Sequence, residues 1–320
     1  MQLTTPVELP SKAVSIHPNT QILFLGSCFA SKIGERMQQN ALCAEVNPFG
    51  TLYNPASIAA CLKAIMNERI EEDWFYQGTD AGWHSILHST LFSAKSLQEC
   101  RENVNLRMTQ AIDFFKGLDV LVVTMGTADV FERNGVVVSN CHKQPSKMFT
   151  QRRLQVREIV EQWQDVLTQL WSCEPGVRVI MTVSPYRYLK KGLHDNQISK
   201  SILLLAIAEL QGWDERILYF PAYEIVMDEL RDYRFYAPDM QHVTDQTADY
   251  IWERFTAWCF DAVTFTYCKN WMSIFKDLHH RPQYPDSAEA KLFKVRAEER
   301  KNLFLSQLSN FHQQIIKQHI

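Results

Sequence analysis

Long apolar runs, clustered cysteines and an excess of positive charge are all missing from this sequence of 320 residues. No stretch approaches the roughly 18 consecutive apolar residues of a membrane-spanning helix, so we expect no membrane partner. The formal net charge of -3 and the lack of a basic cluster predict no nucleic-acid partner. The N-terminal residues lack a basic segment followed by an apolar one, so we expect no signal peptide and a cytoplasmic location.

Two kinds of binding motif are absent as well. The eight cysteines are scattered and form no C-x-x-C pair, whereas a zinc site needs clustered ligands. We therefore expect no metal, and we expect most of the thiols to be reduced core residues. The sequence has no Walker A motif and no G-x-G-x-x-G after a strand, so we expect no cofactor. It leaves the oligomeric state open.

What is present is an alternation of short apolar segments with helical patterns. Strands are expected in the apolar segments, at residues 21–25, 42–46, 118–124, 177–183 and 217–220. Helices are expected at about 29–40, 55–69, 97–116, 153–172, 196–211 and 245–260. Strands that are apolar on both faces suit a parallel sheet covered by helices. The alternation therefore predicts a doubly wound α/β domain with three layers, α/β/α.

Two segments depart from this alternation. Residues 131–138 contain Asn134-Gly135, which favours the tight turn of a hairpin or flap. Residues 264–320 are rich in aromatic and then in polar residues and contain no buried strand, so we expect helices that wrap around the α/β body or form an oligomer contact. We therefore divide the chain into an α/β domain at 1–262 and a helical extension at 263–320 packed on the same domain.

The first candidate site is the Gly26-Ser27-Cys28 sequence at the end of the first predicted strand. Ligands of open α/β sheets bind beyond the carboxyl ends of the strands, and the N-terminus of the following helix favours developing negative charge. Ser27 could be a nucleophile there, or simply the N-cap of the helix. If Ser27 is only a cap, Cys28 could be the reactive atom, because a thiol at a helix N-terminus can have a lowered pKa.

The second candidate site precedes the last core helix. Asp239 and His242 lie three residues apart in a loop that contains Pro238, and Thr244 or Asp245 can cap the helix that follows. The carboxylate could fix the tautomer of the imidazole while the other ring nitrogen faces a nucleophile. The alternative is a turn aspartate beside a histidine that caps a backbone carbonyl. The combination of both sites favours catalysis.

Several segments resemble the GSCFA domain family, which takes its name from the motif at residues 26–30. They cover most of residues 20–260 in the order of the family and read GSCFA at 26–30, NPFGTLYNP at 47–55, TMGTADVF at 124–131, NCHK at 140–143, SPYRYLKKGLHDNQISK at 184–200 and RFYAPDMQH at 234–242. The family in turn resembles the SGNH/GDSL hydrolases. That resemblance implies a flavodoxin-like parallel sheet.

The same resemblance implies roles for individual residues. Ser27 would be the nucleophile, His242 the general base and Asp239 its orienter, while Gly50 would offer its backbone N–H to the oxyanion. The SGNH pattern has Gly-x-Asn after the third strand, and this chain has Ala128 in place of that asparagine.

A side chain must replace the missing donor if the site is catalytic, since losing one oxyanion donor costs about 100- to 1,000-fold in rate. Asn140 and Thr127 are the candidates, and Asn140 is preferred because a carboxamide matches the missing group. Substrate-binding residues are expected among the polar side chains near the same edge, namely Asn54, His88 and His142.

Three functions fit these residues. The first is a serine esterase that removes an acyl group, such as acetyl, from a carbohydrate or small metabolite. The second is an acyltransferase on the same site, in which a sugar hydroxyl replaces water. The third is a non-catalytic ligand-binding protein, which the absent asparagine favours and the Ser27, Asp239 and His242 set opposes. The expected partner in each case is a small molecule or carbohydrate.

Overall fold

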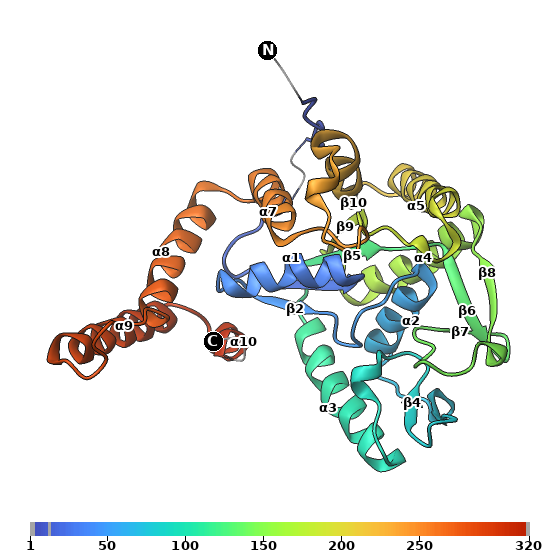
Figure 1. The fold of residues 1–320 in the computed structure, drawn as a ribbon, viewed down its shortest axis with the longest axis horizontal. Coiled ribbons are helices and arrows are strands. Elements are labelled where there is room, and N and C mark those ends of the chain that lie inside the picture. Colours follow the sequence, from blue (N-terminus) through green and yellow to red (C-terminus); the bar gives the residue numbers. More distant parts are fainter. Residues whose placement is uncertain (1–3, 12–13, 318–320) are drawn as a thin grey trace.

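Five short apolar segments form the central sheet in the computed structural model, which describes residues 4–11 and 14–317 (Figure 1). All neighbouring strands are parallel, and their order is β10-β9-β5-β1-β2. Their bounds are β1 Ile22–Gly26, β2 Ala44–Val46, β5 Val120–Met125, β9 Arg178–Val183 and β10 Ile217–Tyr219. This is the flavodoxin-like order, and it confirms the predicted α/β fold.

Helices cover both faces of this sheet, because successive strand residues point to opposite sides. In β1, Leu23 and Leu25 contact one buried cluster, to which α2, α3, α4 and α5 contribute. Ile22 and Phe24 contact the other cluster, to which α1 and α7 contribute. The bounds are α1 Cys28–Gln39, α2 Pro55–Met66, α3 Leu97–Phe115, α4 Val156–Cys173, α5 Leu193–Trp213, α6 Ala222–Glu224 and α7 Asp245–Cys259. A π-helical turn at Ile225–Leu230 follows α6.

Two small antiparallel sheets lie outside the central one. The predicted hairpin forms from β6 Asp129–Arg133 and β7 Val136–Val138, and its turn residues Asn134 and Gly135 both have positive φ. A third strand, β8 Thr150–Arg153, pairs with β6. The second sheet contains β3 Phe75–Gln77 and β4 Trp83–Ser85.

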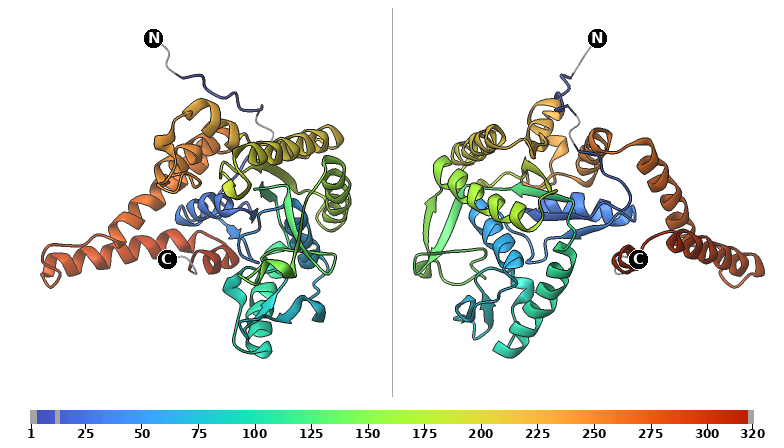
Figure 2. Two further views of the ribbon diagram at one scale, coloured as in Figure 1. Left: turned by 45° about the vertical axis from the view of Figure 1, so that its right-hand side comes forward. Right: turned by 180° about the vertical axis from the view of Figure 1, so that it is seen from behind.

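The C-terminal region is helical, with α8 Ala262–Leu278, α9 Ala288–Ser306 and α10 Asn310–Lys317. Figures 1 and 2 show α9 extending away from the sheet and the chain returning to the body at α10. Trp271 of α8 is 1% exposed and donates its indole N–H to the carbonyl of Gln39 at 2.9 Å. His312 of α10 contacts the carbonyl of Ala41 at 2.9 Å. Both ends of the extension therefore contact the loop after α1. Among the described residues, we find no helix with the length and apolar character needed to cross a bilayer.

Candidate active site

The strand order reverses between β1 and β5, and this is where open α/β sheets bind ligands. Gly26 ends β1 at this point with a φ of +136°, and a Cβ on it would lie 2.1 Å from the carbonyl oxygen of Thr124. Only glycine allows β1 and β5 to approach so closely. The next N–H, that of Ser27, donates to the same carbonyl at 3.1 Å, so the turn into α1 is fixed by the sheet.

Ser27 is the N-cap of α1. Its backbone is extended, and its Oγ accepts a hydrogen bond from Phe29 N at 3.3 Å. The side chain is fully buried, and within the described residues its hydroxyl has no hydrogen bond with His242. The structure thus gives Ser27 the capping role that the sequence left open, and the expected contact between nucleophile and base is not formed.

Cys28, the first residue of α1, is half-buried and therefore more accessible than Ser27. Burial raises the pKa of its thiol above 9.0, and four groups oppose this effect. The ammonium groups of Lys32 and Lys200 lower the pKa, and so do the N–H groups of Phe29 and of Cys28 itself. These groups oppose the effect of burial without overcoming it, so the pKa of the thiol stays raised and the thiol needs a base to ionise it.

Lys200 is a site residue that we did not predict. It lies within α5 and is fully buried, and its ammonium donates to the carbonyls of Gly126 at 2.6 Å and Ser184 at 2.7 Å. These carbonyls follow β5 and β9, so one lysine links these two strand ends next to the place where the strand order reverses (the switch point). Burial lowers the pKa of Lys200 from 10.5 to about 7, whereas the charge of Cys28 raises it.

Asp239 and His242 form the predicted pair. The Nδ1 of His242 lies 2.5 Å from Asp239 Oδ2, and the other carboxylate oxygen accepts from the N–H groups of Gln241 and His242. These hydrogen bonds lower the pKa of Asp239 to about 2, that of the imidazole being the largest cause. The ionised carboxylate holds the proton on Nδ1, so Nε2 carries the lone pair. Both side chains are more than 40% exposed, with values of 44% for His242 and 42% for Asp239.

Ion pairs link α1 to α7, the helix that follows the loop containing Asp239 and His242 (the dyad loop). Lys32 pairs with Asp245, and Arg36 pairs with Asp249 at 2.6 Å. Thr244 caps α7 and accepts from Thr247 N at 3.1 Å. Because α7 starts three residues after His242, these contacts restrict where the imidazole can lie.

Tyr186 is the second site residue that we did not predict. Its ring centroid lies 4.5 Å from that of His242, and its hydroxyl donates to Gln241 at 3.1 Å. Burial raises the pKa of Tyr186 to about 12, with further contributions from the charges of Cys28 and Asp239. Tyr186 therefore lies within electrostatic reach of both candidate sites. In the sequence, the only signal for Tyr186 was its position in the segment 184–200, which resembles the GSCFA family.

The predicted oxyanion donors have internal partners instead. The N–H of Gly50 donates to the carbonyl of Asn47 at 2.7 Å. The hydroxyl of Thr127 is buried and lies 3.0 Å from Ser199 Oγ. The N–H of Thr127 donates to the carbonyl of Tyr53 at 2.9 Å. These groups shape the turns after β2 and β5 and do not present free donors in this structure.

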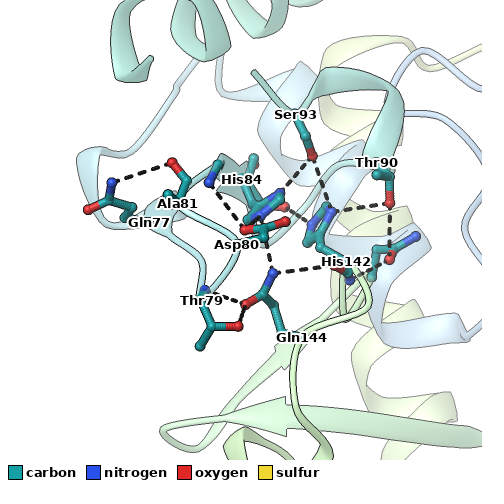
Figure 3. Close-up of polar contacts among 12 residues, drawn as sticks. Gln77, Thr79, Asp80, Ala81, His84, Thr90, Ser93, His142 and Gln144 are labelled. Carbon is teal, nitrogen blue, oxygen red and sulfur yellow. Dashed lines mark hydrogen bonds and ion pairs between the residues drawn. The ribbon is translucent and has the colours of Figure 1, made fainter. Parts of the chain in front are cut away.

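His142 belongs to a polar cluster with His84, Asp80 and Gln144 (Figure 3), and Asn140 joins it through hydrogen bonds with Thr90 and with His142 N. The side-chain oxygen of Asn140 accepts from His142 N at 2.8 Å, as in an Asx-turn. The imidazole of His142 contacts the carbonyl of Ser85 at 2.9 Å and stacks on His84 at 4.7 Å. Asp80 contacts the outer nitrogen of His84 at 3.1 Å. In this structure Asn140 closes its own loop and His142 is buried with backbone and ring partners, while the oxyanion and substrate roles expected for them stay predictions.

Asn54 and His88 are structural as well. Asn54 caps α2, accepting from Ser57 N at 2.8 Å. His88 is fully buried, stacks on Phe49 with ring centroids 4.1 Å apart, and contacts Ser85 Oγ at 2.8 Å. Burial lowers the pKa of His88 to about 3, so the ring is neutral. Neither side chain is available for substrate in this arrangement.

Comparison with known proteins places the chain in one family. The profile of the GSCFA family matches residues 21–255. No curated protein matches the chain. The matched range starts at the first strand and ends in α7, so it includes the switch point, the dyad loop and both small sheets.

Proposed function

Since the chain belongs to the GSCFA family, we propose that it transfers or hydrolyses acyl groups at the switch point, with Cys28 as nucleophile and the Asp239–His242 dyad as base. The substrate class is the one expected from the sequence, an acyl ester such as an acetyl ester of a carbohydrate or small metabolite. Cys28 replaces Ser27 in this proposal, because the Ser27 hydroxyl is buried and caps α1.

One observation carries the proposal. The oriented imidazole of His242 packs on Tyr186, the residue whose pKa is also raised by the charge of Cys28. The thiol at the helix N-terminus therefore lies within electrostatic reach of the tyrosine on which the carboxylate-held histidine packs. A nucleophile, a base and an orienting carboxylate are the parts that covalent acyl transfer requires.

The reaction would follow two steps. First, His242 Nε2 takes the thiol proton, the Cys28 sulfur adds to the ester carbonyl, and the alcohol leaves with the proton from His242. Second, His242 deprotonates water or an acceptor hydroxyl, which attacks the thioester; the C–S bond breaks, and His242 returns the proton to the leaving Cys28 sulfur. Asp239 stays ionised throughout and stabilises the imidazolium. The charge of Lys200 and the N–H groups at the start of α1 favour the thiolate and the developing oxyanion.

The proposal is tested with p-nitrophenyl acetate and iodoacetamide. Cys28→Ala and His242→Gln should each abolish the ester turnover, whereas Ser27→Ala should retain it with a stability loss of about 1 kcal/mol from the missing cap. Peptide mapping after alkylation should find Cys28 labelled. If Ser27→Ala abolishes turnover and Cys28→Ala does not, serine is the nucleophile.

Two further outcomes separate the remaining functions. Adding a sugar alcohol as acceptor distinguishes a transferase, which forms the new ester, from a hydrolase, which releases acetate. Turnover that is absent in the wild type and in every variant would favour the non-catalytic binding protein. The binding-protein hypothesis is supported by one observation: Gly50 N and the Thr127 hydroxyl have hydrogen-bond partners inside the protein instead of facing an oxyanion.

A further inference from the structure

A cavity of 370 Å³ opens beside the dyad loop and takes no part in the proposed chemistry. Its volume is within the range of small-molecule sites. Tyr186 and the dyad are not among its lining residues, which are Arg187, Gln197, Tyr223, Val226, Met227, Asp228, Arg231, Asp232, Tyr233 and Tyr236. The lining includes the π-helical turn after α6, a kind of element that is frequent at functional sites.

Arg187 is the notable charge in this cavity. Its guanidinium lies 5.6 Å from the ring centroid of Tyr233 and 5.2 Å from that of Tyr236. One of its nitrogens, Nη1, donates to the carbonyl of Met240 at 3.3 Å. Within the described part of the chain, we find no carboxylate at ion-pair distance from it. The guanidinium thus has N–H donors left for a ligand.

The acidic residues of the cavity already have cationic partners. Asp228 pairs with Arg231 at 3.7 Å, and Asp232 pairs with Arg234 at 3.5 Å. The four charged lining residues, Arg187, Arg231, Asp228 and Asp232, sum to zero, but both carboxylates face other arginines, so among the described residues Arg187 is left without an anionic partner. A planar guanidinium prefers a carboxylate or phosphate, which it binds through two parallel hydrogen bonds.

The tyrosines define the rest of the ligand. Tyr233 and Tyr236 border the cavity with ring faces that suit a flat or cyclic group. Gln197 also lines the cavity, and its side-chain oxygen accepts from the Tyr223 hydroxyl at 2.9 Å, so the amide N–H groups are the part that a ligand can use. We propose that this cavity is a binding site for a cyclic group that carries one carboxylate or phosphate, with Arg187 as the anion ligand.

The cavity is linked to the dyad loop through the backbone. Arg187 N donates to the carbonyl of Gln241 at 3.0 Å, and its guanidinium contacts Met240, so both contacts lie between Asp239 and His242. If the proposed function holds, the bound group is the remote part of the substrate, and this last step rests on that function. The binding site itself does not.

Calorimetric titration with phenyl phosphate and with benzoate tests the site, and the two probes distinguish a phosphate ligand from a carboxylate ligand. We expect saturable binding of at least one probe in the millimolar range or tighter. Benzyl alcohol, which lacks the anion, should bind at least about tenfold more weakly. Arg187→Gln should lower the affinity for the anionic probe by about tenfold or more, and Arg187→Lys should lower it less because the positive charge remains.

A matched control is Arg216→Gln, because Arg216 also lies over an aromatic ring, Trp171 at 3.6 Å, but outside the cavity. It should leave the affinity unchanged. Should Arg187→Gln fail to fold, Tyr233→Ala on the exposed rim provides the second variant and should weaken binding several-fold. Absence of binding to the wild type, or equal affinity in Arg187→Gln, would overturn the site. Cys28→Ala should bind as the wild type does, so a failure of the proposed chemistry is recognised separately.

Discussion

Replacing Lys200 by methionine should change how stability depends on pH. The folded chain holds this ammonium fully buried, and burial lowers its pKa from 10.5 to about 7. Between these two values the unfolded chain binds the proton and the folded chain releases it. The unfolded state therefore binds more protons, and the free energy of unfolding rises with pH in this window.

The size of the effect follows from the same two values. Between pH 7 and 8.5 the Lys200 contribution to the free energy of unfolding should increase by roughly 1.7 kcal/mol. Thiols of an unfolded chain are about half ionised at pH 8.5, but they are the same in the wild type and in Lys200→Met, so the difference between the two curves isolates the lysine. In Lys200→Met the increase should be absent. At neutral pH the variant also leaves the carbonyls of Gly126 and Ser184 without their donor, at a cost of about 1–3 kcal/mol each.

Urea titrations at several pH values in this window measure the slope directly. Lys190→Met is the matched control, because Lys190 is exposed in the loop before α5 and its removal leaves Lys200 in place, so the slope of the wild type should remain. A second readout is the alkylation rate of Cys28, which should fall several-fold in Lys200→Met because that ammonium lowers the pKa of the thiol. Parallel stability curves for the wild type and Lys200→Met would refute the reasoning.

Three further perturbations have definite outcomes. Burial lowers the pKa of His142 from 6.5 to about 4, so the neutral ring contributes fully to stability above pH 6.5 and this contribution is lost as the pH falls to 4. Urea titrations should show a loss of roughly 3 kcal/mol from this residue, and His142→Gln should abolish that part of the pH dependence. Gly26→Ala should destabilise by more than about 3 kcal/mol, since its Cβ would overlap the Thr124 carbonyl, whereas Gly176→Ala, with open space around it, should change thermal stability little. Trp271→Ala should cost about 3–5 kcal/mol, because its indole is buried; a loss below 1 kcal/mol would show that α8 contributes little to the folded body.

The central sheet was predictable because its strands are apolar on both faces. The run Val120–Met125 has no polar residue on either face except Thr124, which is the pattern of a strand covered by helices on both sides. The strands β3, β4 and β8 were not predictable. Residues 150–153, Thr-Gln-Arg-Arg, have no apolar face and form a strand only because β6 offers backbone partners. Tertiary context decides such short strands.

The site was predicted by region more reliably than by residue. Sequence locates a turn after β1, but the choice between Ser27 and Cys28 depends on which side chain turns back to cap the helix. Lys200 had a detectable signal. It lies three residues before Leu203 and seven before Ile207, on the apolar stripe of α5, and all three are buried. A lysine on a core stripe needs buried acceptors.

The two halves of the candidate site differ in how firmly they are held. Cys28 starts a helix that is fixed by the Gly26 turn and the Ser27 cap, whereas Asp239 and His242 are substantially exposed on a loop. Catalytic hydrogen bonds of this type often tighten only when substrate is bound. Under the proposed function, the loop is therefore the part that must move toward the thiol. Because Arg187 contacts the backbone of the same loop, a ligand bound at that arginine would be coupled to the position of the loop.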